Sequence, residues 1–269
     1  INLTSEAWQM NINRAMLKAD ARAAIRQSQT SPYLTALIYV LIIYVLGILE
    51  TRITGVTIPY DVFLHALETG NTDYLMHLIQ QQAPGPVPYT IGTLLSLMSA
   101  MIGIGFTIFT LLVYRRQGNT VGNLFDGFGN FFRFLWLRIL IWIFTFLWSL
   151  LFFIPGIIAA YSYRQAIYIL IDNPDMRAID CISASKNMKG RKFELFLLDL
   201  SLLGWFLLSA IPFVSVYVFP YTNVTYAAYY ITLLDINAGF GQYPPGGRPY
   251  GSSRYSGDHD DLPPWEFKN

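Results

Sequence analysis

Three charged side chains interrupt long apolar runs of this sequence, and they are its strongest candidates for a chemical role. Arg138, Arg164 and Asp199 each lie within a stretch that is otherwise almost free of charge. An arginine at the centre of a membrane helix costs ~2.5–3.5 kcal/mol on insertion scales, so such a residue usually faces a partner or a polar site. We therefore treat all three residues as intramembrane polar candidates.

Depth within the apolar runs separates the three candidates. Arg138 lies about one turn inside its run, so its side chain can extend to the lipid headgroups. Arg164 and Asp199 lie at a similar depth, which allows an ion pair between two helices. Three interpretations of Arg164 stay open: a pair with Asp199 that fixes packing, a polar site for an anionic solute or headgroup, and extension to the interface.

The elements that carry these residues are predicted from composition and from the lengths of the apolar runs. Of the 269 residues, 54% are hydrophobic and 13% are charged, against roughly 25% charged in ordinary soluble domains. A helix of ~20 apolar residues crosses the ~30 Å hydrocarbon core. The sequence therefore predicts an all-α integral membrane fold of six transmembrane helices in three hairpins, at 33–49, 90–114, 134–154, 156–171, 193–211 and 213–234.

The distribution of lysine and arginine predicts the topology. Basic residues gather in 1–32, in 115–133, in 172–192 and in the tail, whereas the loop 50–88 contains Arg52 against four acidic residues. The chain is then predicted to lie in the cell membrane, where the positive-inside rule places this loop outside the cell and both termini in the cytoplasm. Segments on the same side are joined by an even number of crossings, so each long apolar run after Arg133 must fold back.

Prolines and glycines predict where the chain turns. Pro155 and Gly156 are expected to separate the third and fourth helices, because proline breaks the helical ladder. Pro212 is expected to separate the last two. Asn173 and Pro174 are expected to end the fourth helix and to begin a short helix in the interface. Short interfacial segments are predicted before each hairpin, at 5–27, 119–132 and 174–189.

Three parts of the chain are expected to differ in environment. Segment 1–32 mixes apolar and basic residues, as in an amphipathic helix that lies on an anionic leaflet, with a solvated helix as the alternative. Segment 33–235 is predicted to form the six-helix transmembrane domain. Segment 236–269 is rich in Gly, Pro and Ser and is predicted to be a disordered cytoplasmic tail.

No group of residues predicts an enzyme, a cofactor or a metal site. The sequence has no recognisable nucleophile set, and His65 and His77 in the external loop match no metal-ligand spacing. Asp172 and Asp175 are better explained as residues at helix ends, where Asp172 can meet a basic residue of the following loop. The lone Cys181 excludes an intrachain disulfide, and no basic patch predicts nucleic-acid binding.

Five stretches carry a family resemblance: "NLFDGFGNF" (123–131), "LWSLLFFIPGIIAAYSY" (147–163), "YILIDNPDM" (168–176), "SKNMKGRKFELFLLDLSLLGW" (185–205) and "PYTNVTYAAYY" (220–230). In this order they resemble the bacterial integral membrane family called domain of unknown function 975. The resemblance implies a multipass membrane protein of no established activity.

Two functions are compatible with these features. The first is a non-catalytic membrane component that binds the lipid bilayer, through anionic headgroups, or a protein partner. The alternative is a transporter of a small solute or a lipid-linked compound, with its polar site at Arg164 and Asp199.

Overall fold

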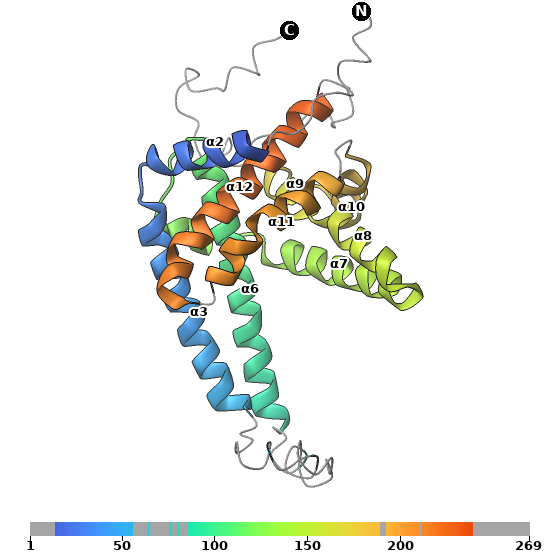
Figure 1. Cartoon of the computed structure of the whole chain (residues 1–269). Helices are drawn as coiled ribbons and strands as arrows, with labels where there is room; N and C mark the ends of the chain where they lie inside the picture. Colours follow the sequence, from blue (N-terminus) through green and yellow to red (C-terminus); the bar gives the residue numbers. More distant parts are fainter. Residues whose placement is uncertain are drawn as a thin grey trace, which may run out of the picture. The chain divides into compact units, whose positions relative to one another are not determined.

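A computed structural model describes residues 14–55, 64, 76, 80, 85–188, 192–209 and 211–238. These residues form helices and contain no strand, which confirms the predicted all-α class. The elements (Figure 1) are α2 (Arg14–Arg26), α3 (Pro32–Thr54), α6 (Pro86–Tyr114), η1 (Val121–Phe128), α7 (Phe131–Leu151), α8 (Phe153–Tyr163), α9 (Ala166–Asp172), α10 (Ala178–Asn187), α11 (Lys192–Leu208) and α12 (Pro212–Ala238).

The chain divides into two compact units, which are described separately. The α3–α6 unit contains residues 12–131 and 198–229. The α7–α10 unit contains residues 132–197 and the described residues 230–238. Helices α11 and α12 each contribute to both units.

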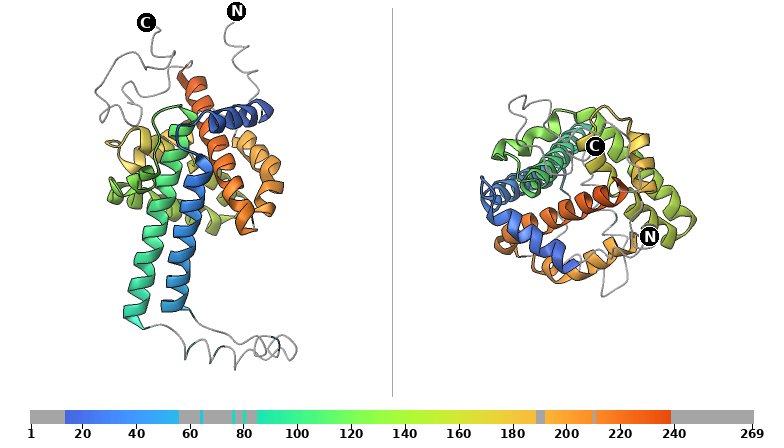
Figure 2. Two further views of the ribbon diagram at one scale, coloured as in Figure 1. Left: turned by 90° about the vertical axis from the view of Figure 1, so that its left-hand side faces the viewer. Right: turned by 90° about the horizontal axis from the view of Figure 1, so that it is seen from above.

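In the α3–α6 unit, α3 and α6 lie side by side as a hairpin (Figure 2). Ser31 caps α3, where its hydroxyl oxygen accepts a hydrogen bond from the Leu34 N–H at 3.4 Å. Pro32 and Pro86 each stand in the first turn of their helix. This position suits proline, because an N–H there has no partner within the helix.

A short 3₁₀ helix, η1, packs against the second half of α6 through two glycines. A Cβ added to Gly105 would overlap the Leu124 carbonyl group and lie 2.9 Å from the Asn123 carbonyl oxygen. A Cβ added to Gly127 would overlap the Met101 carbonyl group. The two backbones are therefore in direct contact, with no room for a side chain between them.

Three helices are long and apolar enough to cross a membrane: α3, α6 and α7. The prediction of six such helices is therefore not met within the described part of the chain. The predicted span 156–171 is divided between α8, of 11 residues, and α9, of 7 residues. Helix α11 has 17 residues, and α12 has 27 but includes many tyrosines, threonines and asparagines.

The turn between α7 and α8 lies at Phe152, so the predicted turn at Pro155 and Gly156 is wrong by three residues. Phe152 is extended, with φ −156° and ψ 145°, and Pro155 follows within the first turn of α8. Proline is tolerated in a first turn, because the N–H that it lacks would have no partner within the helix there. It breaks a helix only from an interior position. Gly156 approaches α7 closely, and a Cβ on it would lie 2.9 Å from the Ser149 Cα.

Asn173 ends α9, as predicted, but Pro174 does not begin the next helix. The Asn173 backbone N–H donates to the Ile169 carbonyl oxygen at 2.8 Å, and its side-chain amide donates to the same oxygen at 3.1 Å. Helix α10 begins four residues later than predicted, at Ala178. The turn from Pro174 to Arg177 fits the bias of proline toward turns at helix ends.

Other predicted boundaries can be compared with the structure. Pro212, predicted to separate the last two helices, is the first residue of α12, one residue before the predicted start at 213, and the segments predicted to be interfacial correspond to α2, η1 and α10. Residues 1–13, most of the loop predicted to be external, which contains His65 and His77, and the tail beyond Ala238 lie outside the described residues.

Candidate functional site

The structure places Arg164 and Asp199 in different units. Arg164 follows α8 at its junction with α9, where it is half-buried and interacts electrostatically with the Tyr168 side chain. Asp199 lies on α11, and its carboxylate accepts a hydrogen bond from the Tyr226 hydroxyl at 2.8 Å. The predicted pair of Arg164 with Asp199, and a transport site built on it, stay predictions.

Arg138 lies in the second turn of α7 and is exposed. Its predicted extension to lipid headgroups also stays a prediction. One turn earlier, Arg133 forms an exposed ion pair with Asp175 at 3.1 Å. An exposed pair of this kind contributes at most about 1 kcal/mol to stability, so it marks a local contact rather than a site.

A buried polar contact of the α7–α10 unit gives Asp172 a partner other than the basic loop residue suggested by the sequence. Asp172 is 4% exposed and accepts a hydrogen bond from the Tyr230 hydroxyl at 2.7 Å. The rings of Tyr230 and Tyr168 stack with centroids 4.9 Å apart. The short distance and the burial are typical of a structural contact that fixes α9 against the end of α12.

The feature most suited to binding a ligand lies in the α3–α6 unit, on helix α2. Its basic residues recur every fourth position, at Arg14, Lys18, Arg22 and Arg26. Residues four apart lie on one face of a helix, so the four form a continuous basic stripe beside the stripe that α2 buries. The buried stripe contains Leu17, Ala21, Ala24 and Ile25.

Lys18 connects the basic stripe to α11. Its ammonium group donates to the Ser201 carbonyl oxygen of α11 at 3.0 Å. Burial lowers the pKa of Lys18, and the neighbouring charges of Arg14 and Arg22 lower it further. Repulsion among cations favours an anion that binds between them, because the anion relieves that repulsion.

An aromatic cluster lies beneath the basic stripe. It consists of Tyr33 on α3, Trp205 on α11, and Tyr217 and Tyr221 on α12. Tyr33 and Tyr217 stack with centroids 5.4 Å apart, and Trp205 lies 5.9 Å from Tyr217 and 5.5 Å from Tyr221. Tyr33 and Tyr217 are 37% and 45% exposed, so part of the cluster is open to a ligand.

Two of the arginines of α2 interact with phenol groups of this cluster. Arg22 interacts electrostatically with the Tyr221 side chain, and Arg26 interacts with that of Tyr33. Guanidinium groups bind phosphate oxygens well, and tyrosine combines an apolar ring with a hydroxyl at the membrane–water boundary. We call the basic stripe and the aromatic cluster together the α2–aromatic surface.

Comparison with known families adds to this picture. Residues 150–237 match the family DUF975, described as a protein of unknown function. The match supports the family resemblance predicted from the sequence over less than half of the chain, and we call residues 150–237 the DUF975 segment.

The DUF975 segment extends from the end of α7 into the last turn of α12. It includes Trp205, Tyr217 and Tyr221 of the α2–aromatic surface, whereas the basic stripe on α2 lies outside it. Comparison with curated proteins and with solved structures found no match.

Proposed function

We propose that this protein is an integral membrane protein whose helix α2 binds the phosphate groups of anionic lipids. The observation that carries the proposal is the α2–aromatic surface, where a basic stripe lies over exposed tyrosines at the start of an apolar helix. The role is one of binding, without catalysis, and it makes lipid the primary partner.

Exposed apolar side chains on α3 support the membrane part of the proposal. Six of them lie along its length, each between 41% and 65% exposed: Leu37, Leu41, Tyr44, Val45, Ile48 and Leu49. A soluble protein rarely exposes so long a row of large apolar residues. In a bilayer the same row contacts acyl chains.

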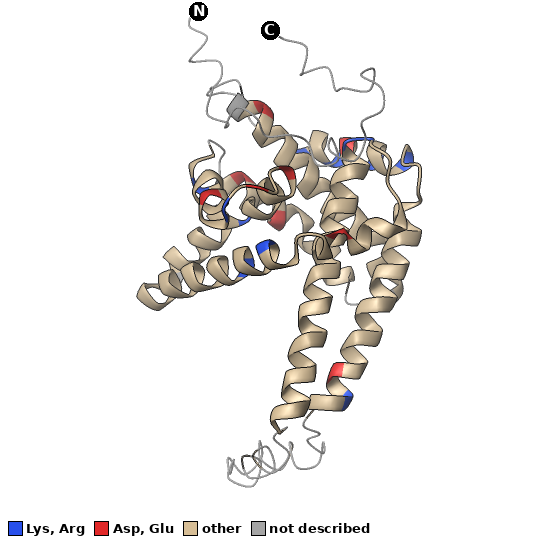
Figure 3. Cartoon of the chain, turned by 180° about the vertical axis from the view of Figure 1, so that it is seen from behind, with Lys and Arg blue, Asp and Glu red and all other residues tan. Residues whose placement is uncertain are grey.

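The charges of the α3–α6 unit support a crossing by α3 and α6. Helix α6 has no charged residue, and on α3 the charges are Glu50 and Arg52 near its C-terminal end. Figure 3 shows the two helices uncoloured over most of their length, with basic residues gathered on α2 at the opposite end of α3. We propose that this basic end is cytoplasmic, in line with the positive-inside rule.

Removing charge from the α2–aromatic surface tests the proposal. In the double variant Arg22→Gln, Arg26→Gln, we expect binding of phosphatidylglycerol to weaken about 30-fold, since each basic residue near an anionic lipid surface contributes about 1 kcal/mol. The measurement is the concentration of phosphatidylglycerol that raises the melting temperature of the full chain in neutral detergent, with phosphatidylcholine as the neutral lipid.

A matched control removes the same charge elsewhere. Arg52 and Lys186 are exposed and lie outside the α2–aromatic surface, so the variant Arg52→Gln, Lys186→Gln should bind phosphatidylglycerol as the wild type does. Equal loss in both double variants would mean that lipid responds to net charge alone. That outcome would contradict a site on α2.

A further inference from the structure

The α11–α12 hairpin of the α3–α6 unit, residues 198–229, lies against the first turns of α3. Tyr217 stacks on Tyr33, and Phe219 makes an edge contact with Tyr39 at 6.1 Å between ring centroids. On the same side, Lys18 of α2 reaches the Ser201 carbonyl oxygen. These contacts join the hairpin to the first part of α3, the end that follows α2 and its basic stripe.

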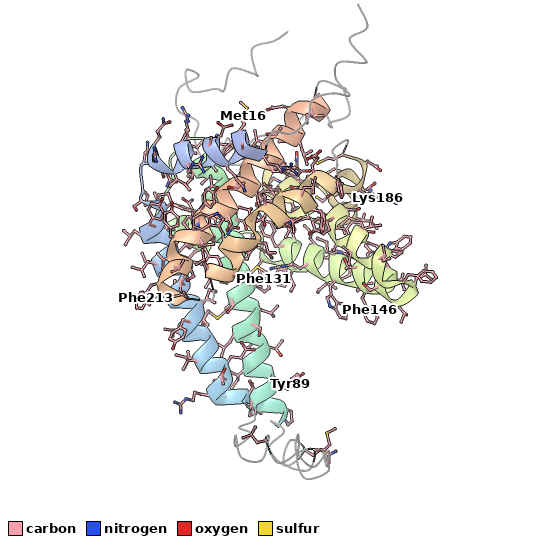
Figure 4. The ribbon with its side chains drawn as sticks, in the orientation of Figure 1. Met16, Tyr89, Phe131, Phe146, Lys186 and Phe213 are labelled. Atoms are coloured by element: carbon pink, nitrogen blue, oxygen red, sulfur yellow. The ribbon has the colours of Figure 1, made fainter. Side chains whose placement is uncertain are left out.

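Helix α3 continues well past these contacts. From Tyr39 it runs to Thr54, which adds about 22 Å at 1.5 Å per residue. Figure 2 shows α3 and α6 extending together beyond the turn of the hairpin. In Figure 4, Phe213 beside this turn lies level with the upper part of α3, while Tyr89 marks the far end of α6.

The turn of this hairpin has an apolar surface. Its large exposed side chains are Leu203, Phe206, Leu207, Leu208, Ile211 and Phe213, and Phe213 is 89% exposed. No charged residue occurs between Leu200 and Leu234. Water is therefore a poor environment for the turn, and hydrocarbon is a good one.

The described residues of the turn, 209 and 211, donate hydrogen bonds to backbone carbonyl groups of α11. The Ser209 N–H donates to the Trp205 carbonyl oxygen at 2.9 Å, and the Ile211 N–H donates to the Leu208 carbonyl oxygen at 3.1 Å. The Ser209 hydroxyl donates to the Phe206 carbonyl oxygen at 2.6 Å. Within hydrocarbon, each unpaired polar group of the backbone is costly, so a turn bonded in this way is suited to lie among acyl chains.

We infer that the α11–α12 hairpin does not cross the bilayer and instead inserts its turn into the leaflet that α2 covers. It enters and leaves on the same side, and its partner is the acyl-chain region of that leaflet. The inference rests on the proposed function, because it requires α3 and α6 to cross a bilayer. It replaces the fifth and sixth predicted crossings.

In this arrangement the hairpin turn lies deeper in the leaflet than the α2–aromatic surface. Basic groups of α2 meet the phosphate region, the tyrosines lie at the boundary, and the hairpin turn lies among the acyl chains below. Basic loops do not distinguish this arrangement from two full crossings, because a hairpin with no crossing also returns the chain to the same side.

The test measures the depth of a spin label in the bilayer. The full chain, carrying Cys181→Ala, is reconstituted in phospholipid vesicles with one new cysteine: Ser209→Cys in the turn, Leu37→Cys near the start of α3, or Leu49→Cys near its end. Nitroxide accessibility to oxygen reports the depth of each label, and accessibility to a membrane-impermeant nickel complex added only outside vesicles of uniform protein orientation reports its leaflet. We expect the label at 209 to lie in the same leaflet as the label at 37.

Two results would overturn parts of this account, and they differ. If the label at 209 lies in the same leaflet as the label at 49, the hairpin crosses and the inference fails, while the proposed function stands. If the labels at 37 and 49 are both open to the nickel complex, α3 does not cross and the proposed function fails. Gly204→Cys, where an added Cβ meets nothing within 4 Å, gives a second label if Ser209→Cys folds poorly.

Discussion

Replacing Gly105 with alanine is expected to lower the free energy of unfolding by about 3 kcal/mol, the upper end of the usual cost of overpacking. The added methyl group would overlap the Leu124 carbonyl group of η1. Backbone cannot rotate away as a flexible side chain can, so η1 must move off α6 or α6 must bend. Denaturant unfolding of the purified chain in detergent measures the loss.

Gly103 supplies the control for this substitution on the same helix. A Cβ on Gly103 would lie 3.8 Å from the Tyr39 hydroxyl, which is an ordinary contact. Alanine also favours a helix over glycine by about 1 kcal/mol, so Gly103→Ala should be neutral or slightly stabilising. Equal stability of the Gly103→Ala and Gly105→Ala chains would show that η1 does not pack on α6 as described.

Replacing Tyr230 with phenylalanine is expected to destabilise the chain by about 2–3 kcal/mol, in the range for hydrogen bonds to charged groups. The change removes the hydroxyl that donates to the buried Asp172 carboxylate at 2.7 Å, and leaves the ring stack with Tyr168 in place. In the double variant with Asp172→Asn, the buried charge that this donor stabilises is also removed. The double variant should therefore lose less than the sum of the two single losses.

Tyr226 supplies the matched control for Tyr230. It lies four residues earlier on α12 and donates to Asp199, which is only half-buried. Because solvent can replace the lost donor at a half-buried carboxylate, Tyr226→Phe should cost at most about half as much. Strictly additive losses for Asp172 and Tyr230 would contradict a coupled buried pair.

Sequence predicted α3 and α6 well because their signal is local. Both helices follow from uninterrupted apolar residues, and the structure extends α3 from the predicted 33–49 to Pro32–Thr54 and α6 from 90–114 to Pro86–Tyr114. Pro155 and Pro212 were both taken for turns between helices, because proline breaks a helical ladder. In the structure both stand in the first turn of the following helix, α8 and α12, a position that also suits proline.

The number of crossings could not be predicted from the charges of the loops. Basic segments fix parity alone, and the number of residues in 193–234 allows two crossings. The arrangement of this hairpin depends on the contacts of Tyr217 and Phe219 with α3, which lie far away in the sequence.

The hydrogen-bond partners of polar residues in the apolar helices could not be predicted from the sequence either. Asp172 and Tyr230 are separated by 58 positions, and no pattern near either residue indicates the other. One part of the α2–aromatic surface, the basic stripe of α2, could be predicted from the sequence, because its basic residues recur every fourth position. Its tyrosines come from α3 and α12 and join it only in the folded chain.

Lipid binding by α2 and insertion of the α11–α12 hairpin both require α3 and α6 to cross a bilayer, with α2 on the cytoplasmic side. Single cysteines at Gly85 and at Gln29 test this in the Cys181→Ala chain. Gly85 precedes α6 and has no atom within 4 Å of an added Cβ, and Gln29 is exposed between α2 and α3. Burial raises the pKa of the Cys181 thiol to about 12, so this thiol should react slowly with maleimide, and Cys181→Ala removes the remaining background.

The measurement is labelling by a membrane-impermeant maleimide in intact cells and after lysis. We expect Gly85→Cys to be labelled in intact cells and Gln29→Cys to be labelled only after lysis. Labelling of both positions only after lysis, or of Gln29→Cys in intact cells, would contradict the account.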